Sequence, residues 1–190
     1  MLPKRLQIQP EALDPRLLWS KTQQELHTTY QRLLRKCESA ENSQGCILIT
    51  TGEVSEHWVA AFNLAMAHSF CGSTLLIDAT ARAHIHTDVL GLTAKADEMG
   101  GLVSKQFMLR AQSAQSVFTT QWPSAVNGVV GDYMFALVQT KDAFKLDWSS
   151  TLKACTVIAL TAPNELEEER WQRLAKLVGS ERFLGLWVID

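Results

Sequence analysis

The sequence predicts an α/β fold, a three-layer sandwich in which helices cover both faces of a mainly parallel central sheet. Strand-like apolar runs alternate with helix-like segments along the chain, a pattern typical of parallel sheets. Residues 46–50 and 74–78 are apolar runs that flank a helix-like segment, 57–70, and elements this close together form a right-handed βαβ unit. The length of 190 residues suits a single domain, here 1–190.

The composition is that of an ordinary soluble protein. Apolar residues make up 46% and charged residues 20% of the chain, and a net charge of −2 gives no electrostatic reason to expect nucleic acid. No apolar run approaches the roughly 20 residues that span a bilayer, and the first ten residues lack the apolar core of a secretion signal. The four cysteines form no CxxC pair and are interpreted as reduced core thiols. We therefore expect a cytoplasmic protein without direct membrane insertion.

The elements before the βαβ unit begin with an irregular lead, residues 1–13. Asp14 and Pro15 are a helix-start signal, with an acid at the N-cap and proline at the first helical position. Leucines and a tyrosine recur at helical spacing after them, so we predict an N-terminal helix at about 15–37. Residues 38–45 form a polar loop into the first strand.

The second half of the chain is predicted from weaker patterns. We expect one helix at 102–114, a short strand at 116–120, buried strands at 133–140 and 156–161, a helix at 165–178 and a closing strand at 184–189. Gly179 follows the last helix, where glycine commonly ends helices.

Within the βαβ unit, Asn63-Leu64-Ala65 lies in the helix and Leu75-Leu76-Ile77-Asp78 forms the second strand, followed by Arg82. These residues resemble the P-loop region of the MinD/ParA-type ATPases, most closely the cytoplasmic bacterial tyrosine kinases of capsule and exopolysaccharide export. The resemblance is good over residues 46–92 and loose over most of the chain. It implies a P-loop NTPase-like fold, with a nucleotide site in the loop at 51–56.

The residues that would hold a nucleotide in this family are replaced. Counting back from Asn63, His57 stands at the position of the phosphate-binding Lys, and Trp58 replaces the magnesium-binding Ser/Thr. Only Gly52 remains of the loop glycines, and an acid such as Glu56 would repel phosphate. Because freed backbone amides and the Lys charge together hold the phosphates, we expect neither tight ATP binding nor hydrolysis.

The acids of the family's site are also incomplete. Thr80 stands where the second acid of the Asp-x-Asp pair belongs, and the acid of a later strand falls on Gln139 or, in another alignment, on Leu137. Thr50, Thr51, Asp78 and Arg82 should converge at the carboxyl ends of adjacent strands. They form either a relic ligand pocket or a structural site in which Asp78 accepts hydrogen bonds from loop amides. The vestigial nucleotide site then comprises Thr50, Thr51, Gly52, His57, Asp78, Arg82 and Gln139.

Two further patterns bear on a contact surface and on a metal site. Arg32 and Arg35 match the arginine spacing of a helix that contacts the next subunit in the kinase family, although solvated arginines near a helix end are a plain alternative. The run His84-x-His86-x-Asp88 resembles part of the metal motif of the metallo-β-lactamase fold, but its sixth position is not histidine. We expect no metal and no cofactor.

Two classes of function follow from the resemblance. One is a non-catalytic pseudo-ATPase or pseudokinase that acts as a regulatory or scaffolding partner in bacterial polysaccharide biosynthesis and export. Its partner would be a membrane polysaccharide co-polymerase, an active paralogue or a second copy of the chain, and a partner would recruit it to the inner membrane face. The alternatives are a MinD/ParA-like division or positioning regulator, or an ATPase or tyrosine kinase with a rebuilt active site. The chain has only two tyrosines, which argues against autophosphorylation.

Overall fold

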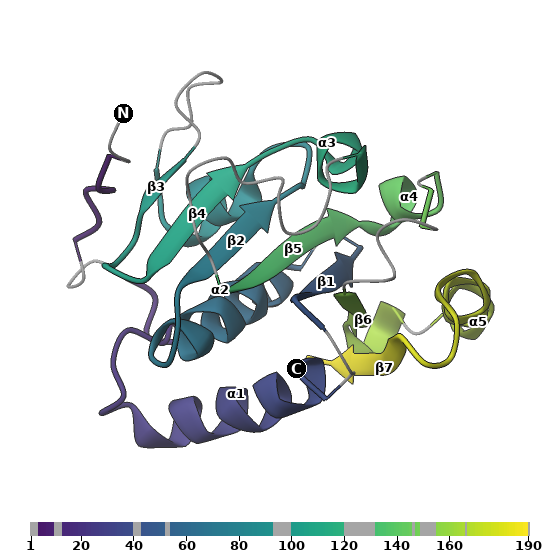
Figure 1. Cartoon of the computed structure of the whole chain (residues 1–190), viewed down its shortest axis with the longest axis horizontal. Helices are drawn as coiled ribbons and strands as arrows, with labels where there is room; N and C mark the ends of the chain where they lie inside the picture. The colour runs from purple at the N-terminus through teal and green to yellow at the C-terminus, as the bar shows by residue number, and fades with distance from the viewer. Residues whose placement is uncertain are drawn as a thin grey trace.

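A seven-stranded sheet forms the middle layer of the protein (Figure 1). The computed structural model describes residues 4–9, 13–39, 43–51, 54–92, 100–119, 132–145, 147–148, 155–165 and 167–189. The strands are β1 (Gly45–Thr50), β2 (Thr74–Asp78), β3 (Gly100–Leu102), β4 (Phe107–Ala111), β5 (Tyr133–Gln139), β6 (Cys155–Thr161) and β7 (Phe183–Val188). Their order is β3-β4-β2-β5-β1-β6-β7, and every neighbouring pair is parallel except β3 with β4.

Helices cover both faces of this sheet, so the predicted three-layer α/β sandwich is confirmed. One face carries α1 (Gln24–Cys37) and α2 (Ser55–Ser69), and the other carries α3 (Ala114–Thr119), α4 (Thr140–Ala143) and α5 (Glu168–Val178). Alternate residues of each strand face opposite layers. In β1, Leu48 belongs to the core cluster under α2, whereas Ile47 and Ile49 belong to the cluster under α5.

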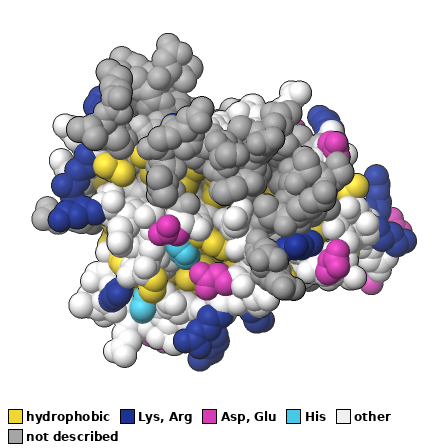
Figure 2. All heavy atoms as spheres, viewed as in Figure 1, with side chains coloured by type: hydrophobic (Ala, Val, Ile, Leu, Met, Phe, Trp, Pro, Cys, Tyr) yellow, Lys and Arg dark blue, Asp and Glu magenta, His cyan; other side chains and the backbone are white. Residues whose placement is uncertain are grey.

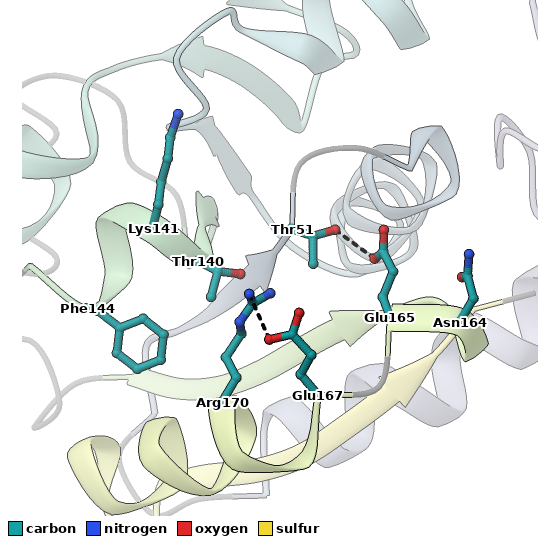
Figure 3. A pocket seen from close by; sticks show the side chains of 8 residues that line it. All are labelled: Thr51, Thr140, Lys141, Phe144, Asn164, Glu165, Glu167 and Arg170. Atoms are coloured by element: carbon teal, nitrogen blue, oxygen red, sulfur yellow. Dashed lines mark hydrogen bonds and ion pairs between the residues drawn. The ribbon is translucent and has the colours of Figure 1, made fainter.

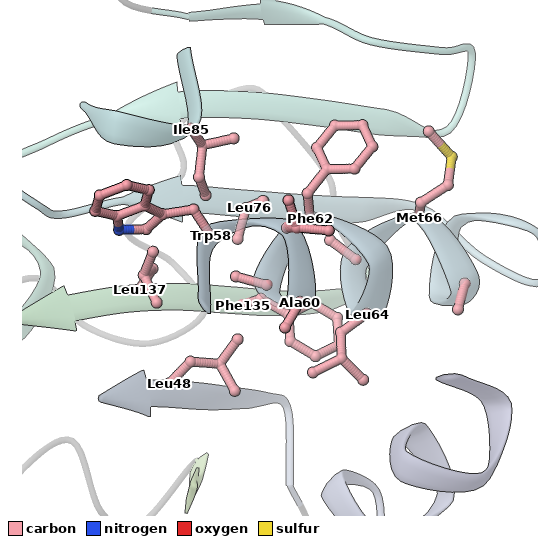
Figure 4. Close-up of a cluster of buried hydrophobic side chains, with 14 of the residues drawn as sticks. Leu48, Trp58, Ala60, Phe62, Leu64, Met66, Leu76, Ile85, Phe135 and Leu137 are labelled. Atoms are coloured by element: carbon pink, nitrogen blue, oxygen red, sulfur yellow. The ribbon is translucent and has the colours of Figure 1, made fainter. Parts of the chain in front are cut away.

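The core between α2 and the sheet is built from large apolar side chains (Figure 4). Phe62 and Leu64 of α2 and Leu76 and Phe135 of the sheet are completely buried in it. Because nearly every residue of α2 is buried, this helix lacks a polar face, as expected for an element covered on all sides. Burial of each such side chain contributes roughly 1.5–3 kcal/mol.

The order of the strands corrects one expectation about the site. Thr50 and Asp78 were expected at the ends of adjacent strands, but β5 lies between β1 and β2. In the register, Thr50 pairs with Gln139, and Asp78 pairs with Leu137. All seven residues of β5 are buried, which suits a strand enclosed on both faces and both edges.

The first helix begins later than the sequence predicts. α1 starts at Gln24 rather than near residue 15, although its end at Cys37 agrees with the predicted boundary. Asp14 begins a turn instead: its carbonyl accepts a hydrogen bond from the Leu17 N–H (3.0 Å), and its Oδ1 accepts one from the Arg16 N–H (2.9 Å). An acid followed by proline serves a turn as well as a helix start, and the sequence pattern did not separate the two.

Asn63 explains why residues 16–18 stay outside the helix. Its Oδ1 accepts the Leu18 N–H at 2.7 Å, and its Nδ2 donates to the Arg16 carbonyl at 2.8 Å. Leu17 and Leu18 are both completely buried. The amide of Asn63 thus ties the segment before α1 onto α2.

The weak predictions in the second half were partly wrong. Residues 102–114 are not one helix, because β3 ends and β4 lies within them, and residues 116–119 lie in helix α3, not in a strand. The residues of β4 (FMLRA) are good helix formers, so packing between β2 and β3 overrides their local propensity. The predicted helix at 165–178 divides into a 3₁₀ turn, η4 (Pro163–Glu165), and α5. Gly179 ends α5 with a φ of 91°, as its position indicated.

None of the helices in the described part of the chain is long and apolar enough to cross a bilayer. On the face in Figure 2, cationic and acidic side chains of the described residues are interspersed. The four cysteines are free, and three of them, Cys37, Cys46 and Cys155, are buried.

Candidate functional site

Three strand ends meet below the first turn of α2, where the family resemblance places the nucleotide. Three leucines face α2 from the sheet: Leu48 in β1, Leu76 in β2 and Leu137 in β5. Because side chains alternate between the two faces of a strand, the residue two positions after each leucine, at the end of its strand, faces α2 as well. These residues are Thr50, Asp78 and Gln139, which are completely or almost completely buried. The fold therefore gathers three of the predicted site residues at one edge of the sheet.

His57, at the position of the family's Lys, is part of the core. Its side chain is completely buried, and its Nδ1 lies 2.8 Å from the Thr50 Oγ1. Burial lowers the pKa of His57, and the nearby carboxylates of Glu165 and Glu56 only partly oppose this fall. The imidazole is therefore neutral near pH 7. It cannot supply the positive charge with which a lysine holds phosphate.

Trp58, at the position of the magnesium-binding hydroxyl, packs against the segment after β2. Its ring stacks on that of His84 with centroids 4.1 Å apart and planes 14° apart. The Nδ1 of His84 lies 2.6 Å from the Asp88 Oδ2. An indole thus occupies the position of a hydroxyl ligand. Within the His-x-His-x-Asp run, His84 and Asp88, the two most exposed members, bind each other. In the residues that the structure describes, no group of three or more His, Cys, Asp or Glu side chains could hold a metal ion.

Asp78 is bonded on both oxygens to the chain that follows it. Its Oδ1 accepts hydrogen bonds from the Thr80 N–H (3.1 Å) and the Thr80 hydroxyl, and its Oδ2 accepts the Ile85 N–H at 2.6 Å. Burial raises the pKa of Asp78, while these donors oppose the rise. The carboxylate thus holds the turn at 79–84 and the start of the π-helix η2 (Ile85–Val89).

The other predicted residues lie apart from this bonded group. Gln139 is the N-cap residue of α4 but makes no capping bond with its side chain, and its buried Oε1 has no hydrogen-bond partner among the described residues. Arg82 is exposed and makes no hydrogen bond or ion pair with a described residue. Gly52, the remaining loop glycine, lies outside the described residues. Thr51 points to the other side of the strand ends, into a separate pocket.

That pocket has a volume of about 540 Å³ and lies at the carboxyl ends of β1, β5 and β6 (Figure 3). The hydroxyl of Thr51 donates to the Glu165 Oε2 at 2.9 Å, joining the end of β1 to η4. On the α5 side, the Arg170 Nη2 pairs with the Glu167 Oε2 at 2.8 Å. The crevice outside the carboxyl ends of parallel strands is where ligands of such folds bind.

Sequence reasoning missed Glu165, which connects the pocket with the residues around Thr50 and His57. Its carboxylate bonds Thr51, 114 residues earlier in the chain, and also acts electrostatically on His57. The sequence pattern predicts Glu165 as the first residue of a helix, with no contact far away in the sequence. Its place in the connection that follows the buried strand β6 was the signal that could have marked it.

Arg32 and Arg35 lie on the solvent side of α1, far along the chain from these sites. Both side chains are exposed, whereas Tyr30, Leu34 and Cys37 of the same helix are buried against the core. The two arginines are therefore accessible to a partner, as a contact through this helix requires.

Comparison with known proteins supports the fold. No family model matches the chain, and no curated protein matches it in sequence. Among solved structures, the chimeric protein CapA2B2 is similar with a TM-score of 0.58 and 10% identity, over 85% of this chain and 83% of that chain. At this identity the likeness concerns the fold, which is P-loop-like.

His86 is a buried histidine, and neither of its ring nitrogens has a hydrogen-bond partner in the part of the chain that the structure describes. It lies in η2, is 3% exposed, and burial lowers its pKa from 6.5 to about 4. Between these two pH values the unfolded chain binds a proton that the folded chain does not. This histidine therefore costs stability as the pH falls below 6.5.

We predict that His86→Leu makes unfolding less sensitive to acid. Leucine has a similar volume and binds no proton. The difference in the free energy of unfolding, variant minus unmodified chain, should therefore be roughly 2 kcal/mol larger at pH 4.5 than at pH 7.5. Urea unfolding at the two pH values measures this change. The control Gln172→Leu, at an exposed and uncharged residue, should keep the pH dependence of the unmodified chain. If His86→Leu also keeps that pH dependence, His86 is not the source of the acid sensitivity.

Proposed function

We propose that this protein is a non-catalytic pseudo-ATPase that acts as a regulatory or scaffolding partner in bacterial polysaccharide biosynthesis and export. The observation that carries the proposal is that the chain uses the nucleotide-site positions for its own packing. His57 bonds Thr50, Trp58 stacks on His84, and Asp78 bonds the backbone after β2.

These contacts leave little for ATP to bind. Phosphoryl transfer depends on a cation at the phosphates, a metal held by a hydroxyl and an acid, and a cradle of amides. Here the cation is replaced by a neutral imidazole and the hydroxyl by an indole. A charge-assisted contact contributes about 1.5–3 kcal/mol, so the loss of the Lys alone weakens binding by roughly one to two orders of magnitude.

The polysaccharide setting rests on a likeness of residues. The residues around Asn63 and Asp78 resemble those of the kinases of capsule and exopolysaccharide export. The likeness to CapA2B2 concerns the fold alone. We infer a partner at the inner membrane face, either a membrane polysaccharide co-polymerase or an ATP-hydrolysing paralogue.

The exposed side of α1 is our candidate for the partner surface. Arg32 and Arg35 lie one turn apart and both are exposed, so they present two positive charges on one side of the helix. Two guanidinium groups at this spacing suit carboxylates on a partner helix. A second copy of the chain is an alternative partner for the same surface.

The first test is calorimetric titration with ATP and magnesium. We expect no binding in the micromolar range and no hydrolysis by the unmodified protein. His57→Lys alone should not restore binding, because Trp58 still replaces the metal ligand and Asp78 remains bonded within the chain. A dissociation constant in the low micromolar range for the unmodified protein would overturn the proposal.

The second test concerns the helix surface. The double variant Arg32→Glu, Arg35→Glu should abolish self-association or binding to the co-polymerase, because it reverses the charge of the contact while leaving the buried side of α1 intact. Light scattering with and without the partner's cytoplasmic segment measures both. The control is Lys105→Glu with Lys176→Glu, an equal charge change at exposed residues away from α1. If both double variants behave like the unmodified chain, α1 has only a structural role.

A further inference from the structure

The exposed apolar side chains of the protein gather on one strand. Among the residues that the structure describes, four large apolar side chains are exposed, and three of them lie in β7: Leu184 (36%), Leu186 (40%) and Val188 (43%). The fourth is Leu177 of α5. Single exposed apolar side chains are normal on a protein surface, but a group of them on one strand indicates a contact surface.

β7 is also the last strand of the described sheet, and its neighbour is β6 (Figure 1). The Ile189 N–H donates to the Thr161 carbonyl of β6 at 2.9 Å. Because the N–H and C=O groups of successive strand residues point to opposite edges, those of Leu186 and Val188 point away from β6. The outer edge of β7 therefore presents backbone donors and acceptors that can pair with another strand.

The sequence of β7 does not protect this edge. Residues 183–189 (FLGLWVI) contain no charged side chain and no proline, although edge strands usually carry such residues against pairing with other molecules. The bulge in the pairing with β6 lies before Gly185, so residues 185–188 follow a regular register. Trp187 holds the strand from the other side, since its ring meets that of Tyr30 with centroids 5.7 Å apart.

The exposed side chains lie on the face of the sheet that carries α5. Trp187 packs against the core cluster under α1 and α2. Because neighbouring side chains of a strand point to opposite faces, Leu186 and Val188 point to the other face. α5 packs over β6 and β7 on that face but leaves these two side chains exposed. A partner at the edge would cover them.

A second copy of the chain fits this edge through a two-fold axis. Antiparallel pairing centred on Leu186 places this residue opposite its own copy and places Leu184 opposite Val188. The three exposed side chains of one strand thus become cross-strand neighbours of those of the other. The contact closes on itself, because both copies use the same surface.

The same axis brings α5 beside its copy in the opposite direction. With strands about 4.8 Å apart, a helix over the last two strands lies about 10 Å from its copy, close to the 8–10 Å of packed helices. Glu168 in the first turn of α5 then lies near the last turn of the other helix, which carries Lys176. Both side chains are exposed, so their opposite charges can pair across the axis.

The edge is large enough for a specific contact. The six residues of β7 are about 20 Å long, and three layers about 10 Å apart make the edge about 30 Å thick. Each copy therefore contributes about 600 Å², or about 1,200 Å² in all, which is the lower end of the range for specific interfaces.

We propose that β7 pairs antiparallel with β7 of a second copy, so that two chains form a dimer with one continuous sheet. The contact uses neither the relic nucleotide site nor Arg32 and Arg35. It therefore holds whether or not the chain has lost ATP binding, and it leaves the arginines of α1 free for another protein.

The first test is a disulfide at the axis, in a Cys71→Ser background that removes the exposed native thiol. Opposite Cα atoms of an antiparallel hydrogen-bonded pair lie about 5.5 Å apart, within the range of a disulfide. Leu186→Cys should therefore give a covalent dimer with oxidised glutathione. Val188→Cys should not, because its two copies lie about four residues, or roughly 13 Å, apart along the strands. A covalent dimer of Val188→Cys without one of Leu186→Cys would overturn the proposal.

The second test is sedimentation equilibrium of the unmodified chain and of Leu186→Lys. The dimer of this variant should dissociate at least about a hundredfold more readily, because its two ammonium groups leave water and lie opposite each other. The control is Leu177→Lys, an equal change at an exposed leucine. Leu177 follows Arg173 by one turn, and the Arg173 guanidinium lies 5.3 Å from the ring centroid of Phe144 beside α4, so this side of α5 faces away from the edge.

The outcomes separate this contact from the α1 surface. We expect Leu177→Lys and the double variant Arg32→Glu, Arg35→Glu to keep the dimer that Leu186→Lys loses. The proposal is overturned if the unmodified chain is a monomer at every concentration, or if Leu186→Lys and Leu177→Lys behave alike. It is also overturned if the arginine variant alone loses the dimer, since self-association then depends on α1.

Discussion

The arrangement of the strand ends below α2 depends on the hydrogen bonds of one buried carboxylate, that of Asp78. An unpaired charge in the core is costly, so this acid is tolerated only because three hydrogen bonds reach it from Thr80 and Ile85. Those bonds fix the turn after β2 and the position at which η2 begins. His84 is thereby positioned to stack on Trp58, and α2 is held by its first turn as well as by its core.

Under the proposed function, the same constraint explains how this fold can persist without nucleotide chemistry. The sheet order, the crossover through α2 and the acid at the end of β2 are properties of the fold, whereas phosphate binding depends on a few exposed groups at the strand ends. In this chain the residues that the resemblance aligns with those groups are buried contacts of the core: a neutral His57 bonded to Thr50, and the indole of Trp58 stacked on His84. On the proposed function, these positions contribute packing and not phosphate binding.

The fold was largely predictable near residues 45–92 and poorly predictable beyond them. The strand, helix and strand there have long apolar runs, and their observed bounds differ from the predicted ones by two residues at most. In contrast, the placement of β5 between β1 and β2 comes from long-range pairing, and β4 is a strand only because β2 and β3 flank it. The site divides in the same way. His57 and Trp58 could be located by counting from Asn63, but the bond between Thr51 and Glu165 joins loops that are 114 residues apart, and no local pattern indicates it.

The free energy of unfolding of Asp78→Asn, measured in urea at pH 7, tests most directly whether this acid is structural. Asparagine places an amide where the Oδ2 or Oδ1 accepts a hydrogen bond, so one buried donor loses its partner. The account predicts a loss of about 2 kcal/mol, within the range for an unsatisfied buried group. If the acid served ligand binding instead, its replacement would leave the free energy of unfolding equal or larger, because it would relieve a destabilised site. Equal or greater stability in Asp78→Asn would therefore contradict the account.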